Sequence, residues 1–383
     1  MNLLEVRDVG PIKHATVEFG DLTILVGPQA SGKSVFLQML KFALDRPHIV
    51  SRMREAGLNF DFNLMDLFLG PGFRRPGDSG KGHVFADGDL IEAGKVEGLE
   101  APEGERVFYI PANRSICYTR EGWIRSFSDF NASDPFTVRD FSEEVRSLLE
   151  LGYRRHATVF PAADQPLMVQ KRVGEVIFAG FQIAIDRTTP QKRLVLRHPQ
   201  SENYLLLNSW SAGQREFIPL LLGINRCLPG HNTPLPYPWL IIEEPELGLH
   251  PEGIMAAMGA LLELFSIPSR PPVRLCVSTH SNAVLDIVWA LRQFQSHAAS
   301  HRLVLKMLGL PSTPELESMA QRLLQKKIAV YYFDRNTGTT SDISNLDPGS
   351  ADAIEAGWGG LTGWSGEIGN LVAAAVSMSE SAE

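Results

Sequence analysis

The stretch Gly27-Pro28-Gln29-Ala30-Ser31-Gly32-Lys33-Ser34 constrains the fold of this chain more than any other segment. It follows the apolar run 22–26 and precedes the helical pattern 35–40, which predicts a strand, a glycine-rich loop and a helix in succession. Glycines let the backbone N–H groups turn toward phosphate oxygens, and the helix N-terminus adds the positive end of its dipole. The stretch therefore predicts a phosphate-binding loop, in which Lys33 contacts the β- and γ-phosphates and Ser34 binds Mg²⁺. A chance match to the pattern is the alternative, and the flanking strand and helix disfavour it.

Length and composition bound the class of protein. The chain has 383 residues, of which 44% are hydrophobic and 21% charged, as in an ordinary globular protein with two domains or one large domain carrying an insertion. No apolar run reaches the roughly 18 residues of a membrane span, and the start of the chain lacks the apolar core of a signal peptide. A cytoplasmic protein without a membrane partner is therefore expected.

Charge and cysteine content exclude further classes. The net charge of −8 excludes a basic character of the whole chain, so any nucleic-acid contact must use a local patch. Cys117, Cys227 and Cys276 are far apart in the sequence, which favours buried free thiols over a disulfide framework or a zinc site.

Hydrophobic periodicity predicts an α/β fold. After residue 195 strands and helices alternate, which implies right-handed crossovers on a mostly parallel sheet. Strands are predicted at 2–7, 14–19, 22–26, 84–86, 107–110, 193–197, 239–242, 273–278 and 328–333, with two more in 173–186 that turn at Gly180. Helices are predicted from the phosphate loop to about Asp45, before Pro47, and at 141–151, from Ser211, at 251–265 and at 281–295.

Two acids follow the apolar run 239–242. A carboxylate at the end of a parallel strand beside a phosphate loop holds Mg²⁺, which predicts this role for Glu243. The adjacent carboxylate of Glu244 can polarise an attacking water. A solvated acidic loop is the alternative.

Two further clusters lie near helix starts. Ser211-Ala212-Gly213-Gln214 opens a helix, and a capped helix N-terminus of this kind can bind an anion. Its alternative is an ordinary capped helix. His280 follows the apolar run 273–278 and could sense a γ-phosphate, whereas an incidental strand-end histidine is the alternative.

Together these residues resemble the motifs of ABC-type ATPases. The phosphate loop is similar to a Walker A motif, Leu240–Glu244 to a Walker B strand, Ser211–Gln214 to the ABC signature and His280 to the switch histidine. The run Glu243-Glu244-Pro245-Glu246-Leu247-Gly248-Leu249-His250-Pro251 resembles the branch that contains SMC, RecF and OLD heads. Tyr109-Ile110-Pro111-Ala112-Asn113-Arg114 resembles a segment of stand-alone AAA-family ATPases of bacterial phage-defence operons.

The resemblance covers about 1–47 and 195–335, with a match inside the intervening segment only near 107–114. It implies a P-loop NTPase of the ABC-ATPase head type, with antiparallel N-terminal strands, a parallel Walker core and an inserted α+β lobe. The expected ranges are 1–47 for the N-terminal part of the ATPase lobe, 48–192 for the inserted lobe, 193–335 for the C-terminal part of the ATPase lobe and 336–383 for a C-terminal tail.

The same resemblance assigns roles to residues. It implies that the loop from Gly27 to Ser34 holds the phosphates of ATP, that Ser34 and Glu243 bind Mg²⁺, and that Glu244 is the catalytic base. His280 would contact the γ-phosphate, and Leu249-His250 would form the dimer-crossing D-loop. Ser211, Gly213 and Gln214 would close over ATP bound to the other subunit of a homodimer. Glu243 stands where transporters carry Asp, and Asn113 is the nearest candidate for the Q-loop residue.

We therefore expect an ATP-hydrolysing homodimer that regulates a separately encoded effector, a nuclease or toxin, or senses nucleic acid in phage defence. A RecF-like ATPase of DNA repair, the ATPase subunit of a membrane transporter and a kinase are the alternatives. Scattered basic residues could form a phosphate-contacting patch or lie solvated and apart: Arg52, Arg54, Arg74, Arg75, Arg154, Arg155, Lys171 and Arg172.

Overall fold

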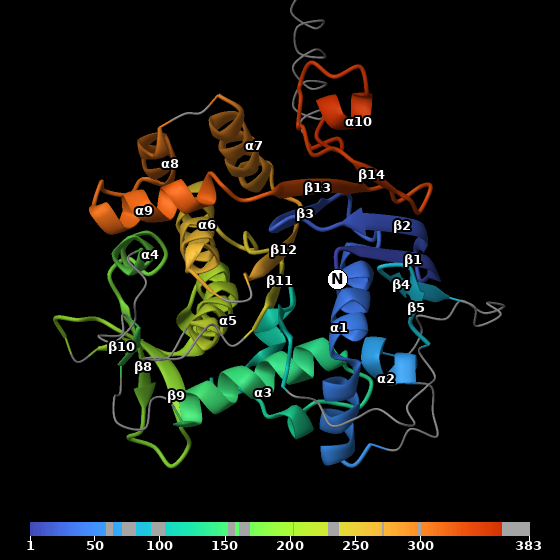
Figure 1. The fold of residues 1–383 in the computed structure, drawn as a ribbon. Helices are drawn as coiled ribbons and strands as arrows, with labels where there is room; N and C mark the ends of the chain where they lie inside the picture. Colours follow the sequence, from blue (N-terminus) through green and yellow to red (C-terminus); the bar gives the residue numbers. More distant parts are fainter. Residues whose placement is uncertain are drawn as a thin grey trace, which may run out of the picture.

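A six-stranded sheet lies at the centre of the structure (Figure 1). Five of its strands run parallel, because β13 and β12 both pair parallel with β3, and β11 pairs parallel with β12 and β6. The sixth, β14, pairs antiparallel with β13 at one edge. Their order is β14 (Thr340–Asp342), β13 (Ile328–Phe333), β3 (Leu22–Val26), β12 (Arg274–Thr279), β11 (Trp239–Glu243) and β6 (Val107–Ile110).

The computed structural model describes most of the chain. All five residues of β3 and of β11 are buried, as expected for apolar strands covered on both faces. The described residues are 1–58, 64–70, 82–92, 104–151, 158–160, 169–201, 203–228, 237–269, 272–297 and 300–361.

An antiparallel sheet covers the N-terminal side. Its order is β2 (Ile12–Glu18), β1 (Leu3–Val9), β4 (His83–Ala86) and β5 (Asp89–Leu90). Its apolar residues pack with those of α1 (Lys33–Glu55) and α2 (Leu64–Leu69) in one core. The predicted α/β fold, with antiparallel N-terminal strands and a parallel core, is confirmed.

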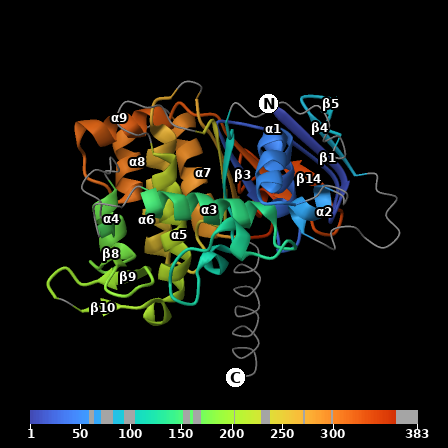
Figure 2. The same ribbon diagram turned by 90° about the horizontal axis from the view of Figure 1, so that it is seen from below.

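Helices cover the opposite side of the central sheet, as Figures 1 and 2 show. Their apolar residues form a second core with β11, β12 and the remaining sheet. That sheet has the order β10 (Tyr204–Leu205), β9 (Arg193–Arg197), β8 (Gln182–Asp186), β7 (Thr158–Phe160). The helices are α3 (Phe136–Leu151), α4 (Gln170–Val176), α5 (Ala212–Cys227), α6 (Pro251–Ser266), α7 (Asn282–Ser296), α8 (His301–Leu308) and α9 (Pro314–Leu323), with η1 (Arg114–Cys117), η2 (Phe127–Asp129), η3 (Leu207–Ser209) and the terminal α10 (Ala353–Ala356).

Two predictions of local structure are wrong. Helix α1 does not end before Pro47 but continues to Glu55, with a kink at Asp45 (φ −123°, ψ 18°). A proline fits the first turn of a helical segment, where no intrahelical N–H bond is lost, so Pro47 sits comfortably after the kink. The segment 173–186 holds the end of α4 before β8, rather than two strands. Its apolar residues 173, 176 and 177 have helical spacing, which outweighs their preference for strands.

The segment 48–192 contributes to all three sheets. Strand β6 is an edge of the central sheet, β4 and β5 extend the N-terminal sheet, and β7 and β8 belong to the third. The division of the chain into four ranges stays a prediction. In the tail, Trp358 is buried and packs against Trp289 with 6.0 Å between ring centroids, while Trp364 and Ser377–Glu383 lie outside the described residues.

A buried lysine joins the two halves of the structure. Lys41 of α1 donates to Asp45 Oδ2 (3.2 Å), to the carbonyl of Val107 (2.7 Å) and to Glu105, and its Nζ lies 3.6 Å from Asp140 Oδ2 on α3. Burial opposes the charge of Lys41, but the three carboxylates outweigh it and raise its pKa. The same burial raises the pKa of Glu105 to about 7.

Removal of this ammonium is expected to destabilise the fold. Lys41→Met leaves Asp45, Glu105 and Asp140 buried around an apolar side chain, which predicts a loss of about 3–5 kcal/mol in the free energy of unfolding. Urea denaturation measures it. Lys306→Met, at an exposed lysine of α8, is the matched control and should stay within about 0.5 kcal/mol of the wild type. Equal midpoints for the two variants would contradict this view of Lys41.

Candidate functional site

The phosphate loop lies between β3 and α1, as its sequence predicts. Gly27 has φ 149° and Gly32 has φ 99°, backbone conformations that residues with a Cβ rarely adopt. A Cβ on Gly32 would also lie 2.6 Å from Ile12 Cγ1 of β2. The two glycines are therefore required for the shape of the loop and for its contact with the N-terminal sheet.

Lys33 is buried within this loop. Its Nζ donates to the carbonyls of Gly27 and Pro28, both at 2.9 Å, and to Ser31 Oγ at 3.3 Å. Burial lowers the pKa of Lys33 to about 8, although the carboxylates of Glu244, Glu243 and Glu246 act in the opposite direction. The loop thus holds an ammonium group in a poorly solvated place, where an anionic ligand would favour its charged form.

A cavity of about 370 Å³ opens over the loop. Four separate parts of the sequence line it: the turn between β1 and β2, the loop with the start of α1, the end of β11 and the end of β12. Glu244 and His280 are thereby brought to the same space as Lys33 and Ser34. The lining residues are Pro11, Gln29, Ala30, Ser31, Gly32, Lys33, Ser34, Val35, Glu244 and His280.

Glu243 ends β11 and is buried. Its Oε2 accepts a hydrogen bond from the N–H of Ala112 (3.1 Å), whereas its Oε1 has no partner among the described residues. Burial raises the pKa of Glu243, and the Ser34 hydroxyl and the Ala112 N–H oppose this shift. An orphaned carboxylate oxygen close to a hydroxyl is a donor set that fits Mg²⁺, which prefers oxygen ligands.

Glu244 follows in a left-handed backbone conformation, with φ 43°. Its Oε1 lies 3.3 Å from His280 Nε2. The interaction with His280 lowers the pKa of Glu244, against the effect of burial, so its carboxylate is charged at neutral pH. Glu244 and His280 therefore form a pair at the mouth of the cavity.

Glu246 supports this pair and was missed by the sequence analysis. Its Oε1 accepts from Thr279 Oγ1 and from the N–H of His280, both at 2.8 Å. It thus fixes the end of β12 against the loop that follows β11. The only sequence signal is its place as the third acid of Glu243-Glu244-Pro245-Glu246.

The residues Ser211 to Gln214 form the start of α5. Ser211 Oγ accepts from the N–H of Gln214 (3.2 Å) and the N–H of Ser211 donates to Gln214 Oε1 (3.0 Å), a reciprocal capping box. A Cβ on Gly213 would lie 2.5 Å from the carbonyl of Gly248. Ser211 is exposed, and none of the described residues that line the cavity over Lys33 comes from this helix. One subunit therefore does not bring this motif to its own phosphate loop.

His250 of the expected D-loop and Asn113, the Q-loop candidate, both lie beside elements of the site. His250 caps α6, where its Nδ1 accepts from the N–H of Glu252 at 3.4 Å. Asn113 is exposed just after β6, the strand beside β11. The next residue, Arg114, is fully buried. It was named in the sequence analysis only as part of the run Tyr109–Arg114 and was given no role.

The described members of the basic set considered as a nucleic-acid patch lie on two separate helices, α1 and α4. Arg52 of α1 pairs with Asp140 and Glu144, and Lys171 of α4 pairs with Glu175. Figure 1 shows α1 and α4 on opposite sides of the structure. Residues 74, 75, 154 and 155 lie outside the described residues.

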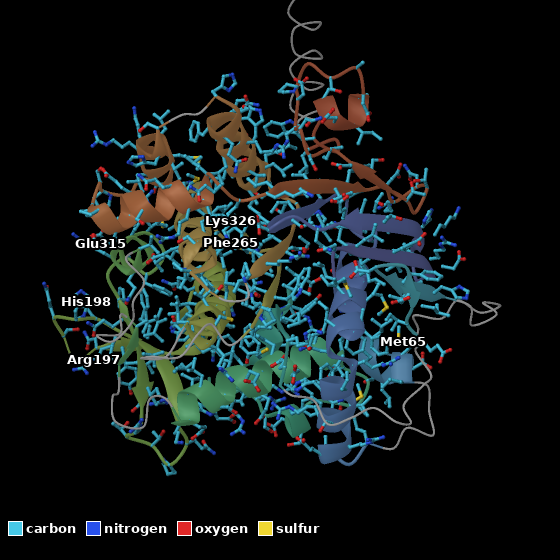
Figure 3. The ribbon with its side chains drawn as sticks, in the orientation of Figure 1. Met65, Arg197, His198, Phe265, Glu315 and Lys326 are labelled. Carbon is cyan, nitrogen blue, oxygen red and sulfur yellow. The ribbon has the colours of Figure 1, made fainter. Side chains whose placement is uncertain are left out.

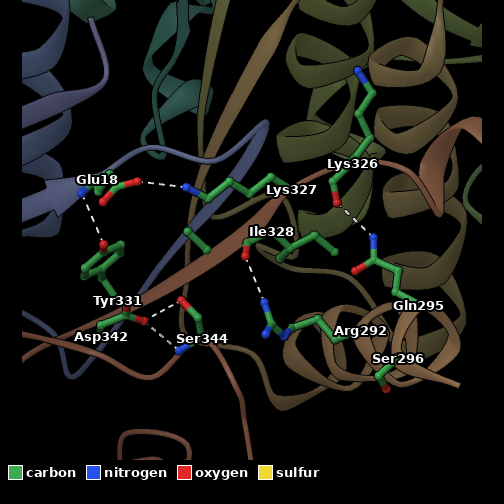
Figure 4. Close-up of a pocket in the computed structure, with 11 residues that line it drawn as sticks. Glu18, Arg292, Gln295, Ser296, Lys326, Lys327, Ile328, Tyr331, Asp342 and Ser344 are labelled. Atoms are coloured by element: carbon green, nitrogen blue, oxygen red, sulfur yellow. Dashed lines mark hydrogen bonds and ion pairs between the residues drawn. The ribbon is translucent and has the colours of Figure 1, made fainter.

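A larger groove of about 540 Å³ lies where β13 begins (Figure 4). Because β13 runs parallel to β3, this is the opposite end of the strands from Lys33. Its charges are occupied: Lys327 Nζ lies 2.8 Å from Glu18 Oε1, and Arg292 donates to the carbonyl of Ile328 (2.9 Å). Lys326 lies 4.5 Å from the ring centroid of Phe265 (Figure 3). These three basic side chains of the groove thus each have a partner among the described residues.

A phosphate loop between a strand of a parallel sheet and the helix that follows, with acids at the end of another strand of that sheet, defines a P-loop protein. The chain belongs to the family described as "AAA domain, putative AbiEii toxin, Type IV TA system", whose model matches residues 22–286. The predicted relation to AAA-family ATPases is thus confirmed. No match was found among curated proteins.

Solved structures show remote likeness. The SMC head domain from Thermotoga maritima has a TM-score of 0.36 at 11% identity, over 89% of this chain and 97% of that chain. The ATP-binding subunit of an ABC transporter has a TM-score of 0.34 at 13% identity, over 90% of this chain and 91% of that chain. In the described part of the chain, no helix combines the length and apolar character that a bilayer crossing requires.

The pKa of Lys33 predicts a pH dependence of nucleotide binding. The free protein loses the Lys33 proton above about pH 8, whereas phosphates favour the ammonium. Binding of ADP should therefore take up a proton, and its affinity should fall by up to about tenfold per pH unit above pH 8. Calorimetric titrations between pH 7 and 9.5, in buffers of different ionisation enthalpy, measure both quantities. A flat affinity, with equal heats in all buffers and an unchanged circular dichroism spectrum, would contradict the low pKa.

Proposed function

We propose that this protein binds and hydrolyses ATP, with two nucleotides held between the subunits of a homodimer. The observation that carries the proposal is the cavity in which Lys33, Ser34, Glu244 and His280 meet. It combines a phosphate-binding loop with a charged carboxylate that can act as a base. Membership of the AAA-domain family supports the same chemistry.

The side chains have distinct tasks in this proposal. Lys33 exchanges the loop carbonyls for phosphate oxygens, and the N–H groups of the loop hold the β-phosphate. Glu244, charged at neutral pH, accepts a proton from the water that attacks the γ-phosphate. His280, 3.3 Å from Glu244, orients that carboxylate and contacts the γ-phosphate. Mg²⁺ held by Ser34 and Glu243 would neutralise phosphate charge during transfer.

The separation of the Ser211–Gln214 motif from the phosphate loop of the same chain supports the proposed dimer. Ser211 is exposed at the N-terminus of α5 and lies outside the cavity of its own subunit. An exposed helix N-terminus offers N–H groups and a positive dipole to an anion. We place Ser211, Gly213 and Gln214 over the γ-phosphate bound to the second subunit, so that ATP closes the dimer and hydrolysis opens it.

The proposed setting is phage defence, in the cytoplasm, with an effector nuclease or toxin or with nucleic acid as partner. The family description, which names a toxin of a type IV toxin–antitoxin system, supports a defence setting. A RecF-like ATPase of DNA repair is the alternative, and the ATPase subunit of a transporter is a more distant one. The ion pairs of Arg52 and Lys171 weigh toward a protein partner.

Replacing the proposed base should separate binding from hydrolysis. Glu244→Gln is expected to lower ATP hydrolysis by roughly 10²–10⁴-fold while ATP binding persists, so that ATP-bound dimers accumulate. Phosphate release and light scattering after size-exclusion chromatography measure the two effects.

The matched control is Glu121→Gln, an exposed glutamate in a turn remote from the cavity lining, which should hydrolyse ATP normally. Hydrolysis by Glu244→Gln at the wild-type rate would show that Glu244 is not the base. An ATP-saturated monomer would argue against the joint binding of nucleotide.

A further inference from the structure

Arg114 is a buried arginine for which the proposed chemistry has no task. It opens η1, directly after β6, and its exposure is 0%. Among the described residues its guanidinium donates to backbone carbonyls alone: Nη1 to Pro111 (3.0 Å) and Glu243 (2.7 Å), Nη2 to Glu244 (3.0 Å), and Nε to Glu216 (3.2 Å). A buried guanidinium is costly unless its N–H groups are satisfied. Here the N–H groups of Arg114 hold backbone carbonyls in place and, within the described part of the chain, do not pair with a carboxylate.

One end of this network holds the peptide of Glu244. The φ of 43° at Glu244 is unfavourable for a residue with a Cβ. Three hydrogen bonds hold its backbone: its N–H donates to the carbonyl of Ser278 (2.8 Å), and its carbonyl accepts from the N–H of Leu247 (3.1 Å) and from Arg114 Nη2 (3.0 Å). Arg114, which donates to the carbonyls on both sides of Glu244, is the side chain that fixes this backbone from the direction of β6.

The other end holds the first turns of α5. Pro219 has no N–H, so the carbonyl of Arg215 lacks its donor within the helix. The hydroxyl of Tyr118, just after η1, donates to that carbonyl (3.2 Å), and Arg114 Nε donates to the next one, of Glu216. The segment from Arg114 to Tyr118 is thereby attached to the helix that begins with Ser211.

We propose that Arg114 is a positioning residue that couples the two nucleotide sites of the dimer. It connects helix α5, whose N-terminus would contact the nucleotide of the second subunit, with the peptide that aims Glu244 at the nucleotide of its own subunit. A displacement of α5 then changes the position of Glu244 through one rigid, planar side chain. This inference rests on the proposed function and adds to it how hydrolysis at one site is controlled by the nucleotide at the other.

The test replaces the planar fork with a single ammonium. Arg114→Lys keeps the charge but cannot bridge Glu216 to both Glu243 and Glu244. We expect kcat for ATP to fall about 100-fold, as for a small misplacement of a catalytic group, with KM unchanged and cooperativity between the two ATP sites lost. Arg292→Lys is the matched control, because Arg292 also donates to a backbone carbonyl, that of Ile328 (2.9 Å), but lies in the groove where β13 begins and not beside Glu244. It should keep kcat, KM and cooperativity.

A second variant keeps the test decisive if Arg114→Lys does not fold. Tyr118→Phe removes only the hydroxyl that reaches Arg215 and should lower kcat about fivefold, the effect of one hydrogen bond, with reduced cooperativity and unchanged KM. If Arg114→Lys folds and its kcat and cooperativity equal those of the wild type, the coupling is overturned. If Arg114→Lys does not fold, the same result for Tyr118→Phe overturns it.

Failure of this inference is distinguishable from failure of the proposed function. If the wild type hydrolyses ATP and Glu244→Gln does not, while Arg114→Lys matches the wild type, only the role of Arg114 is overturned. If the wild type does not hydrolyse ATP, or if Glu244→Gln still does at the wild-type rate, the proposed function itself is overturned.

Discussion

The parallel pairing of β3, β12 and β11 is the constraint on which the site depends. In this register Val26 lies opposite Thr279, and Ser278 lies opposite Glu243. Three strands that end at the same level place the phosphate loop, His280 and Glu244 at one edge of the sheet. Because strands β3 and β11 are buried on both faces, a slip in register would expose apolar residues and is opposed by the whole core. The geometry of the cavity is thus a consequence of sheet packing rather than of loop contacts alone.

The sequence predicts those parts of the site that depend on local patterns. Glu243 and Glu244 stand at the end of one apolar strand, His280 follows another directly, and Lys33 lies in the glycine-rich pattern after a third. The ends of parallel strands meet at one edge. The role of Arg114 could not be predicted in this way, because its partners Glu216 and Glu244 are more than 100 positions away in the sequence. The same holds for the Lys41 cluster, whose acids come from α1, from the segment before β6 and from α3.

The errors in the fold prediction have local causes. Proline was taken as the end of α1, but Pro47 begins a second helical segment after the kink at Asp45. The valines of α4 and Ile177, which follows it, were assigned by strand preference, although their spacing is helical. In both cases the prediction relied on the conformational preference of single residues. The structure instead agrees with the spacing of the apolar residues along the sequence.

The central claim is that the loop of one subunit and α5 of another share a nucleotide, and crosslinking tests it most directly. The native cysteines are free and buried, so Gln29→Cys and Ser211→Cys can be introduced on separate Glu244→Gln chains as accessible thiols. Mixed chains treated with a short bifunctional thiol reagent should form covalent dimers with ATP and not without it. Lys306→Cys in place of Ser211→Cys should form none. If ATP produces no such dimer, or if a chain that carries both cysteines crosslinks residues 29 and 211 within one monomer, the account of a shared nucleotide is contradicted.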